Sequence, residues 1–287
     1  MTTHFKTGTF KLDNNHTINR FGFGAMRITG TGIWGQPADK AESLRVLKRA
    51  VELGVNFIDT ADAYGPNVSE ELIAEALYPY PKDLIIATKG GLLRSGPGKW
   101  NPDCSPKHLR EALEGSLKRL RKDVIDLYQL HTIDISVPVE DSVGTLADMQ
   151  KEGKIRFVGV SNFKVSDLEK IKHLTNIVTV QNRYNLADRV DEPVLEYCDK
   201  HNIGYIPWFP LDMGNIPKGK SAITLVAKKY NATDAQIALA WLLKRSPVIL
   251  PIPGTSKVAH LEENMKADEI ELSDDDFKQL GKSYNKD

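Results

Sequence analysis

The chain has 287 residues, of which 41% are hydrophobic and 26% are charged, the composition of an ordinary globular protein with a core of normal size. Its 38 basic and 38 acidic side chains balance. No whole-chain field therefore favours nucleic acid or an anionic membrane as a partner.

The N-terminal segment predicts a β-hairpin, because two short runs, 9–12 and 17–21, flank the turn-forming sequence Asp13-Asn14-Asn15. From there on, short apolar runs alternate with longer amphipathic stretches. In chain order these predict strand 21–26, helix 40–53, strand 56–58, helix 69–77, strand 84–88, helix 105–120, strand 124–130, helix 139–151, strand 155–160, helix 165–174, strand 177–180, helix 192–201, strand 205–208, helices 223–229 and 234–244, strand 248–252, and helices 258–265 and 273–282.

Several helix ends carry the expected signals. Asp39, Ser69 and Thr233 are predicted caps, Pro106 suits a first helical position, and Gly54 follows a predicted helix end. Eight strands, each followed by a helix, in about 250 residues predict an α/β fold, a (β/α)8 TIM barrel with an N-terminal β-hairpin. Nothing resembling a linker divides the chain, so we expect one domain over 1–287. A doubly wound open sheet is the alternative.

Mostly polar residues follow the predicted strands. In a (β/α)8 barrel all of these positions open onto the carboxyl-terminal face, where active sites lie. The residues are Asp59, Lys89, His131, Ser161, Asn162, Gln181, Asn182, Trp208, Gly254, Thr255 and Ser256.

Four of the side chains near that face suggest proton chemistry. A free phenol has a pKa of about 10, and the Lys89 ammonium is expected to lower the pKa of Tyr64. Asp59 is expected to hold Lys89 in an ion pair, and His131 to donate to a carbonyl oxygen that Tyr64 protonates or deprotonates. None of the four groups is an electron or hydride carrier, so redox chemistry requires a cofactor. No Cys/His cluster has metal-ligand spacing, so no metal is expected.

These residues stand in motifs that resemble those of the aldo-keto reductases. The segments 59–65, 87–89 and 130–131 resemble the family's catalytic tetrad of Asp, Tyr, Lys and His. Segment 158–162 and Gln181 resemble its nicotinamide contacts, and Trp208 its stacking aromatic. Segment 252–256, followed by Glu263-Asn264, resembles the site for the adenosine and its 2′-phosphate.

The resemblance implies an NAD(P)H-dependent oxidoreductase that reduces a small-molecule aldehyde or ketone, with Asp59, Tyr64, Lys89 and His131 as catalytic residues. It also implies a pocket wall formed by Met26, and we expect Trp34 and Trp100 to face the substrate. The implied cofactor-binding residues are Ala25, Met26, Ser161, Asn162, Gln181, Trp208, Pro210, Leu211, Gly254, Thr255, Ser256, Lys257, His260, Glu263 and Asn264.

The phosphate site departs from that of the well-known animal members. Gly254 stands where they have a Lys, and His260 where they have an Arg. Lys257 is expected to supply the positive charge, which makes NADPH the expected cofactor and NADH the alternative. The short tail after Gly281 resembles that of small bacterial members. The oligomeric state stays open, with a monomer favoured.

Two alternatives remain. The segment 30–35 matches GxGxxG, the pattern of a Rossmann-type dehydrogenase, but Pro37 and Asp39 place the helix start beyond its third glycine. The other alternative is a cofactor-binding barrel without efficient turnover.

The sequence also indicates the cellular compartment. The N-terminal 15 residues contain no apolar run and no long apolar stretch follows, so neither a signal peptide nor a membrane span is expected. Cys104 and Cys198, the two cysteines, stand in dissimilar contexts, which is typical of a reducing compartment. We therefore expect a cytoplasmic protein.

Overall fold

A computed structural model describes residues 5–211 and 221–284. At its centre is a curved sheet of parallel strands, in the spatial order β11-β10-β9-β8-β5-β4-β3. The strands are β3 (Phe23–Gly24), β4 (Phe57–Asp59), β5 (Ile85–Gly90), β8 (Ile125–Leu130), β9 (Ile155–Ser161), β10 (Ile177–Arg183) and β11 (Gly204–Trp208).

The segment 248–252, predicted as the eighth strand, closes the ring without forming a regular strand. The Tyr205 amide donates to Val248 O at 2.8 Å, and Tyr205 O accepts from the Leu250 amide at 2.8 Å. On the other side the Gly22 amide donates to Pro251 O at 3.0 Å. The prediction of a regular strand is wrong because a proline has no amide hydrogen for the ladder. The fold is nevertheless the predicted (β/α)8 barrel.

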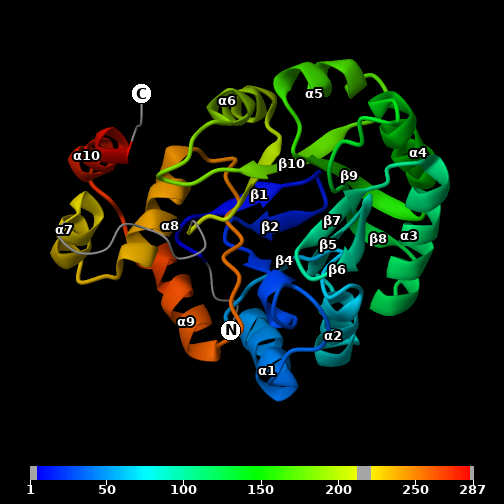
Figure 1. Ribbon diagram of the computed structural model, residues 1–287. Helices are drawn as coiled ribbons and strands as arrows, with labels where there is room; N and C mark the ends of the chain where they lie inside the picture. Colours follow the sequence, from blue (N-terminus) through cyan, green and yellow to red (C-terminus); the bar gives the residue numbers. More distant parts are fainter. Residues whose placement is uncertain (1–4, 212–220, 285–287) are drawn as a thin grey trace.

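Helices surround the sheet on its outer side (Figure 1). They are α1 (Lys40–Glu52), α2 (Val68–Leu77), α3 (Pro106–Leu120), α4 (Val139–Lys151), α5 (Val165–Ile171), α6 (Glu192–His201), α7 (Ala222–Lys229), α8 (Asp234–Arg245), α9 (Val258–Met265) and α10 (Asp274–Tyr284), with 3₁₀ turns η1 (Ala25–Ile28) and η3 (Lys266–Glu269). Two predicted caps are confirmed, since Asp39 accepts from the Glu42 amide and Thr233 from the Gln236 amide.

Other boundaries differ from the prediction. Helix α2 begins at Val68, and its cap position is Asn67 rather than Ser69. The Ser69 hydroxyl instead donates to Ala25 O at 3.1 Å and accepts from the Thr60 hydroxyl at 2.7 Å. These bonds join the first turn of α2 to the ends of β3 and β4. The predicted strand 21–26 is reduced to β3, because the chain turns into η1 at Ala25.

The predicted N-terminal hairpin is confirmed as β1 (Thr9–Lys11) and β2 (Thr17–Asn19), and it lies across the middle of the ring of helices (Figure 1). The Asn19 amide donates to Asn56 Oδ1 at 2.7 Å, just before β4 begins. The hairpin therefore covers the amino-terminal end of the barrel and leaves the carboxyl-terminal end to the site.

A second hairpin, β6 (Leu92–Gly96) and β7 (Lys99–Pro102), follows β5 directly and was not predicted. Its strands carry charged residues on both sides of Pro97-Gly98, so they lack the apolar alternation that marks a strand packed on a core. The hairpin rises from the carboxyl end of the barrel, beside the candidate site.

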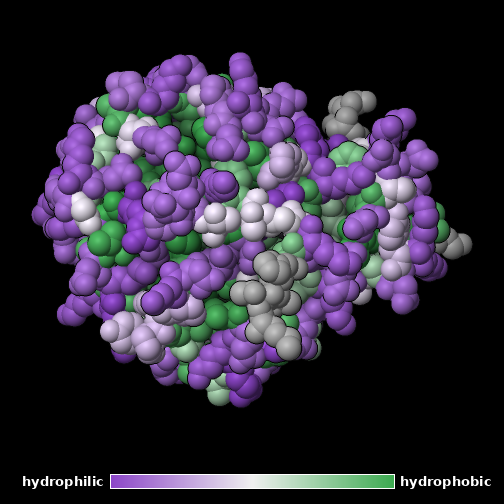
Figure 2. All heavy atoms as spheres, turned by 180° about the vertical axis from the view of Figure 1, so that it is seen from behind, coloured by the Kyte–Doolittle hydropathy of each residue, from purple (hydrophilic) through white to green (hydrophobic). Residues whose placement is uncertain are grey.

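One hydrophobic cluster forms the core and includes side chains from the strands and from the inner faces of the helices. Figure 2 shows a mostly hydrophilic surface on the side that faces away in Figure 1, with hydrophobic atoms gathering toward its middle. Within the described residues, no helix is long and apolar enough to cross a membrane.

Candidate active site

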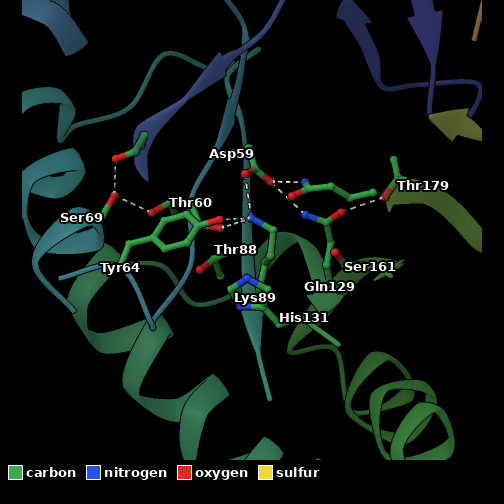
Figure 3. A network of polar contacts seen from close by, with 12 residues as sticks. Asp59, Thr60, Tyr64, Ser69, Thr88, Lys89, Gln129, His131, Ser161 and Thr179 are labelled. Carbon is green, nitrogen blue, oxygen red and sulfur yellow. Dashed lines mark hydrogen bonds and ion pairs between the residues drawn. The ribbon is translucent and has the colours of Figure 1, made fainter. Parts of the chain in front are cut away.

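The centre of the site is a buried ion pair between the ends of two neighbouring strands. Asp59 ends β4 and Lys89 lies near the end of β5, and their side chains are 3% and 0% exposed. Lys89 Nζ donates to Asp59 Oδ2 at 2.7 Å, to Thr60 O at 2.8 Å and to the Tyr64 hydroxyl oxygen at 3.3 Å (Figure 3). An ammonium has three N–H donors, so all of them are used within the protein.

Two amide side chains donate hydrogen bonds to the other carboxylate oxygen of Asp59. Its Oδ1 accepts from Gln129 Nε2 at 3.0 Å and from Gln181 Nε2 at 2.8 Å. Gln129 also accepts from the Thr179 hydroxyl at 3.4 Å, which fixes its amide orientation. Gln129 stands in none of the sequence motifs, although a polar residue inside the buried run of β8 was the signal that could have identified it.

Tyr64 lies on the loop between β4 and α2, with its hydroxyl toward Lys89 (Figure 3). The expectation that its pKa is lowered is wrong. Burial raises the pKa of the phenol above its ordinary value, and the nearby Lys89 ammonium offsets only part of that effect. For Lys89, burial lowers the pKa, but Asp59 and Tyr64 outweigh it and hold the pKa above the usual value. Tyr64 is therefore a phenol and Lys89 an ammonium at neutral pH.

His131 follows β8 and faces the Tyr64 ring edge-on, with ring centroids 5.8 Å apart. Burial, and then the charges of Lys89 and Arg94, hold the pKa of His131 well below its ordinary range, so the imidazole is neutral at pH 7. Its Nδ1 is buried and has no hydrogen-bond partner among the described residues. His131 also lines a cavity, where a neutral imidazole can donate or accept a hydrogen bond with a ligand.

These side chains open into a cavity of about 1060 Å³, a volume at the upper end of ligand pockets. Asp59, Tyr64 and His131 line it, whereas Lys89 lies behind them and is fully buried. Other lining residues that the sequence predicted are Met26, Trp100, Ser161, Asn162, Gln181, Trp208, Pro210, Leu211, Gly254, Thr255, Ser256, His260, Glu263 and Asn264.

One wall of the cavity carries amide, hydroxyl and indole groups. Asn162 donates to His131 O at 3.1 Å and accepts from the Trp208 indole at 3.1 Å. Its backbone φ is 63°, a left-handed conformation that Asn adopts more readily than most residues. The hydrogen bond to Asn162 holds the Trp208 ring, which is partly buried, at the cavity wall.

The opposite end of the cavity lies at the start of α9 and carries Thr255, Ser256 and His260. Arg27, which no sequence motif indicated, also lines the cavity there, with its Cγ 3.6 Å from the position of a Cβ added to Gly254. Hydroxyls, a guanidinium and a helix N-terminus are groups that suit phosphate. The residues present therefore fit the phosphate portion of a nicotinamide cofactor.

Besides Lys89, three residues expected to contact cofactor or substrate do not line this cavity. Ala25 is buried, and its carbonyl accepts from Ser69. Lys257 is exposed just before α9, so Arg27 is better placed than Lys257 to meet a phosphate. Trp34 lies outside the cavity wall, with its ring centroid 5.6 Å from Arg94 Cζ.

The GxGxxG segment 30–35 is a loop, and α1 begins only at Lys40. Its Trp34 forms an isolated bridge with Gly65, beside the Tyr64 loop. The barrel fold excludes the Rossmann alternative. Within residues 5–211 and 221–284, no group of three or more His, Cys, Asp or Glu side chains is arranged to hold a metal ion.

Comparison with known proteins identifies the class. The family model "Aldo/keto reductase family" matches residues 20–285. An uncharacterised oxidoreductase of Schizosaccharomyces pombe is 52% identical over 275 residues, which cover 96% of this chain and 89% of that protein. Pyridoxine 4-dehydrogenase of Escherichia coli is 42% identical over 275 residues, covering 94% of this chain and 96% of the relative.

A solved structure extends the comparison to the fold. The crystal structure of an aldo-keto reductase from Klebsiella pneumoniae in complex with NADPH matches with a TM-score of 0.82 at 26% identity, covering 96% of this chain and 94% of that one. The chain therefore belongs to the aldo/keto reductase family, whose members are NAD(P)H-dependent oxidoreductases.

Proposed function

We propose that the protein reduces an aldehyde or ketone to the alcohol with NADPH, and that Tyr64 donates the proton to the carbonyl oxygen. The observation that carries this proposal is the hydrogen bonding of Lys89. Its three donors are taken by Asp59, Thr60 and the Tyr64 oxygen, so the phenol hydrogen of Tyr64 is left for a ligand in the cavity.

When bound, the reduced nicotinamide supplies the hydride that adds to the carbonyl carbon. Tyr64 gives its proton to the oxygen as negative charge develops there, and the adjacent Lys89 ammonium stabilises the phenolate that remains. His131 donates to the same oxygen and orients it. Asp59 keeps Lys89 charged and in position. Solvent then returns a proton to Tyr64.

The cofactor is proposed to lie along the cavity. Trp208 would stack on the nicotinamide, with Ser161, Asn162 and Gln181 at its carboxamide, and Arg27 with His260 would meet the phosphates. Binding is measured by fluorescence titration with NADPH and with NADH. We expect tighter binding of NADPH, and Arg27→Ala to weaken NADPH more than NADH, with the exposed Lys257→Ala as the matched control.

Turnover is tested by following the absorbance of NADPH with a panel of carbonyls. Pyridoxal is included because the 42%-identical relative is a pyridoxine 4-dehydrogenase. Oxidation of NADPH that depends on the carbonyl, with one alcohol formed per NADPH, supports the proposal. Binding of NADPH without oxidation by any carbonyl would instead favour a cofactor-binding barrel without efficient turnover.

The proposed compartment is the cytoplasm. Both Cys104 and Cys198 are free and buried, which suits a reducing environment.

A further inference from the structure

Three loops at the carboxyl end of the barrel meet around one guanidinium. They are the glycine-rich loop 30–35 after β3, the Tyr64 loop after β4, and the β6–β7 hairpin after β5. Arg94 on β6 lies between them and is half-buried. Neither the sequence motifs nor the proposed chemistry gives this residue a role.

The hydrogen bonds of Arg94 reach all three loops. Its Nη1 donates to Ile33 O at 3.0 Å and to Ala63 O at 2.9 Å, and its Nη2 donates to Gly32 O at 3.2 Å. Its Nε donates to Lys99 O, across the hairpin, at 3.0 Å. A planar guanidinium with five N–H donors can hold several carbonyls in a fixed geometry, which the ammonium of a lysine cannot.

Arg94 also fixes an aromatic side chain at the cavity. Its Cζ lies 3.7 Å from the centroid of the Trp100 ring. Trp100 lines the cavity and stands edge-on to Tyr64 and to His131, with ring centroids 6.4 Å away in both cases. The rings of Trp100, Tyr64 and His131 therefore meet where the proposed proton donor, Tyr64, faces the cavity. The flat ring of an aromatic ligand is the shape that stacks in such a corner.

The same residue supports the backbone next to the proton donor. Ala63, which accepts from Arg94, immediately precedes Tyr64 in the chain. The Gly65 amide donates to Ile33 O at 3.3 Å, and Ile33 O also accepts from Arg94. Removal of the guanidinium would take a hydrogen-bond donor from Ala63 O, in the loop that carries Tyr64, and from Ile33 O, in the neighbouring loop.

We propose that Arg94 is a positioning residue that ties the three loops together and holds Trp100 against Tyr64 and His131, so that the enzyme prefers ring-bearing conjugated carbonyls over aliphatic ones. The substrate preference rests on the proposed carbonyl reduction. The role of Arg94 in tying the three loops together is independent of that function.

The substrate test compares benzaldehyde with heptanal, which has the same number of carbon atoms. Wild type should favour benzaldehyde. Arg94→Ala should lower kcat/KM for benzaldehyde by about tenfold, the value of one aromatic contact, mainly through KM. The heptanal value should fall less, because an aliphatic chain has no ring to stack against Trp100. The Kd for NADPH should change little, because the phosphate end of the cavity is formed by other loops. Trp100→Leu should lose the same preference.

Two further variants separate geometry from charge and from unfolding. Arg94→Lys keeps the positive charge but loses the planar guanidinium with its five N–H donors, so it should behave like Arg94→Ala. Added guanidinium chloride at millimolar concentration should partly rescue Arg94→Ala. Arg110→Ala removes an exposed arginine that pairs with Glu152 on the outer surface, and it should leave both substrates unaffected. Full activity in Arg94→Lys would overturn positioning in favour of a charge effect on Tyr64 and His131.

A second measurement does not depend on turnover. Backbone hydrogen exchange of segments 30–35 and 92–102 should speed up in Arg94→Ala and not in Arg110→Ala. Unchanged exchange together with an unchanged benzaldehyde preference overturns the proposal. Absence of carbonyl reduction by wild type overturns the proposed function and the substrate preference, while hydrogen exchange still decides whether Arg94 joins the loops.

Discussion

At the scale of single residues, the site depends on how buried charges are compensated. Lys89 remains an ammonium inside the barrel because Asp59 is held 2.7 Å away by two glutamine amides. Asp62 is a different case. It is buried in the same loop as Tyr64, and its Oδ1 has no hydrogen-bond partner among the described residues. Burial, and then the neighbouring Glu70, raise the pKa of Asp62 to about 8.

This raised pKa predicts a pH dependence of stability. In the unfolded chain an aspartic acid loses its proton near pH ~3.9, whereas in the folded protein Asp62 keeps it up to about pH 8. The folded state therefore binds more protons between these values, and the contribution of Asp62 to the free energy of unfolding falls as pH rises from about 4 to about 8. Asp62→Asn mimics the protonated form and should remove this contribution.

The measurement is urea unfolding of wild type and Asp62→Asn at pH 5.5 and at pH 8.5. The variant should gain stability relative to wild type on going to the higher pH. Asp148→Asn, at an exposed aspartate on α4, provides the control and should show no such gain. An equal difference between wild type and Asp62→Asn at both pH values would mean that Asp62 is ionised throughout.

At the scale of elements, the close contact of β5 with β8 explains a glycine at the end of β5. A Cβ added to Gly90 would lie 2.1 Å from the Tyr128 hydroxyl, which is fully buried and has no hydrogen-bond partner among the described residues. Gly90→Ala should therefore destabilise the fold by about 2 kcal/mol, as overpacked cores do.

The same contact predicts a rescue. Tyr128→Phe removes the oxygen that clashes, so Gly90→Ala should cost clearly less in that background, although the ring carbon beneath still lies 3.1 Å from the added Cβ. Tyr128→Phe alone should be nearly neutral, because the lost hydroxyl made no hydrogen bond. Denaturant unfolding of the double-mutant cycle checks this. Equal costs in both backgrounds would show that the strands shift apart instead.

A buried ion pair links α2 to α3. Glu70 is fully buried and accepts from Arg119 Nε at 2.6 Å and from the Thr88 hydroxyl at 2.5 Å. Arg119→Ala should cost about 3 kcal/mol, because it leaves a buried carboxylate without its partner. Glu70→Gln combined with Arg119→Ala should cost less than Arg119→Ala alone by thermal or urea unfolding. A larger cost for the double variant would contradict the uncompensated charge as the cause.

At the scale of the whole molecule, the barrel explains which parts of the site the sequence could predict. Asp59, Lys89 and His131 end different strands, and parallel strands in a closed barrel bring those ends to one face. Their meeting follows from the order of the elements. The shift in the pKa of Tyr64 could not be predicted in the same way. Burial raises this pKa and the Lys89 charge lowers it, so the direction of the shift depends on how deeply the fold buries the phenol.

The remaining differences arise where tertiary contacts override local patterns. The apolar residues of segment 248–252 predict a strand, yet its Pro251 has no amide hydrogen and the segment forms only isolated bonds between β11 and β3. The β6–β7 hairpin could not be predicted because its strands have no apolar alternation. Hydrogen bonds of the Arg94 side chain hold it in place instead of packing against the core. The sequence did not reveal that Arg27 lines the cavity and that Lys257 does not, because both positions depend on how η1 and α9 turn.

Cofactor binding should also be visible in the stability of the whole barrel. The cavity is lined by residues from β3, β4, β9, β10, β11 and the closing segment, so a bound cofactor would link most of the ring. NADPH at 100 times its Kd should stabilise the fold by about 2.7 kcal/mol and raise Tm accordingly. NADH at the same concentration should raise Tm less. No shift with either cofactor would contradict binding in this cavity.

The most direct test is a single-turnover measurement on Tyr64→Phe. The variant keeps the ring that packs against His131 and lacks only the proposed proton. With NADPH bound and a saturating aldehyde, the rate of NADPH oxidation should fall by about 10² to 10⁴ relative to wild type, while the Kd for NADPH stays unchanged. Oxidation near the wild-type rate would show that the proton comes from another group, and Tyr64 would then not be the acid.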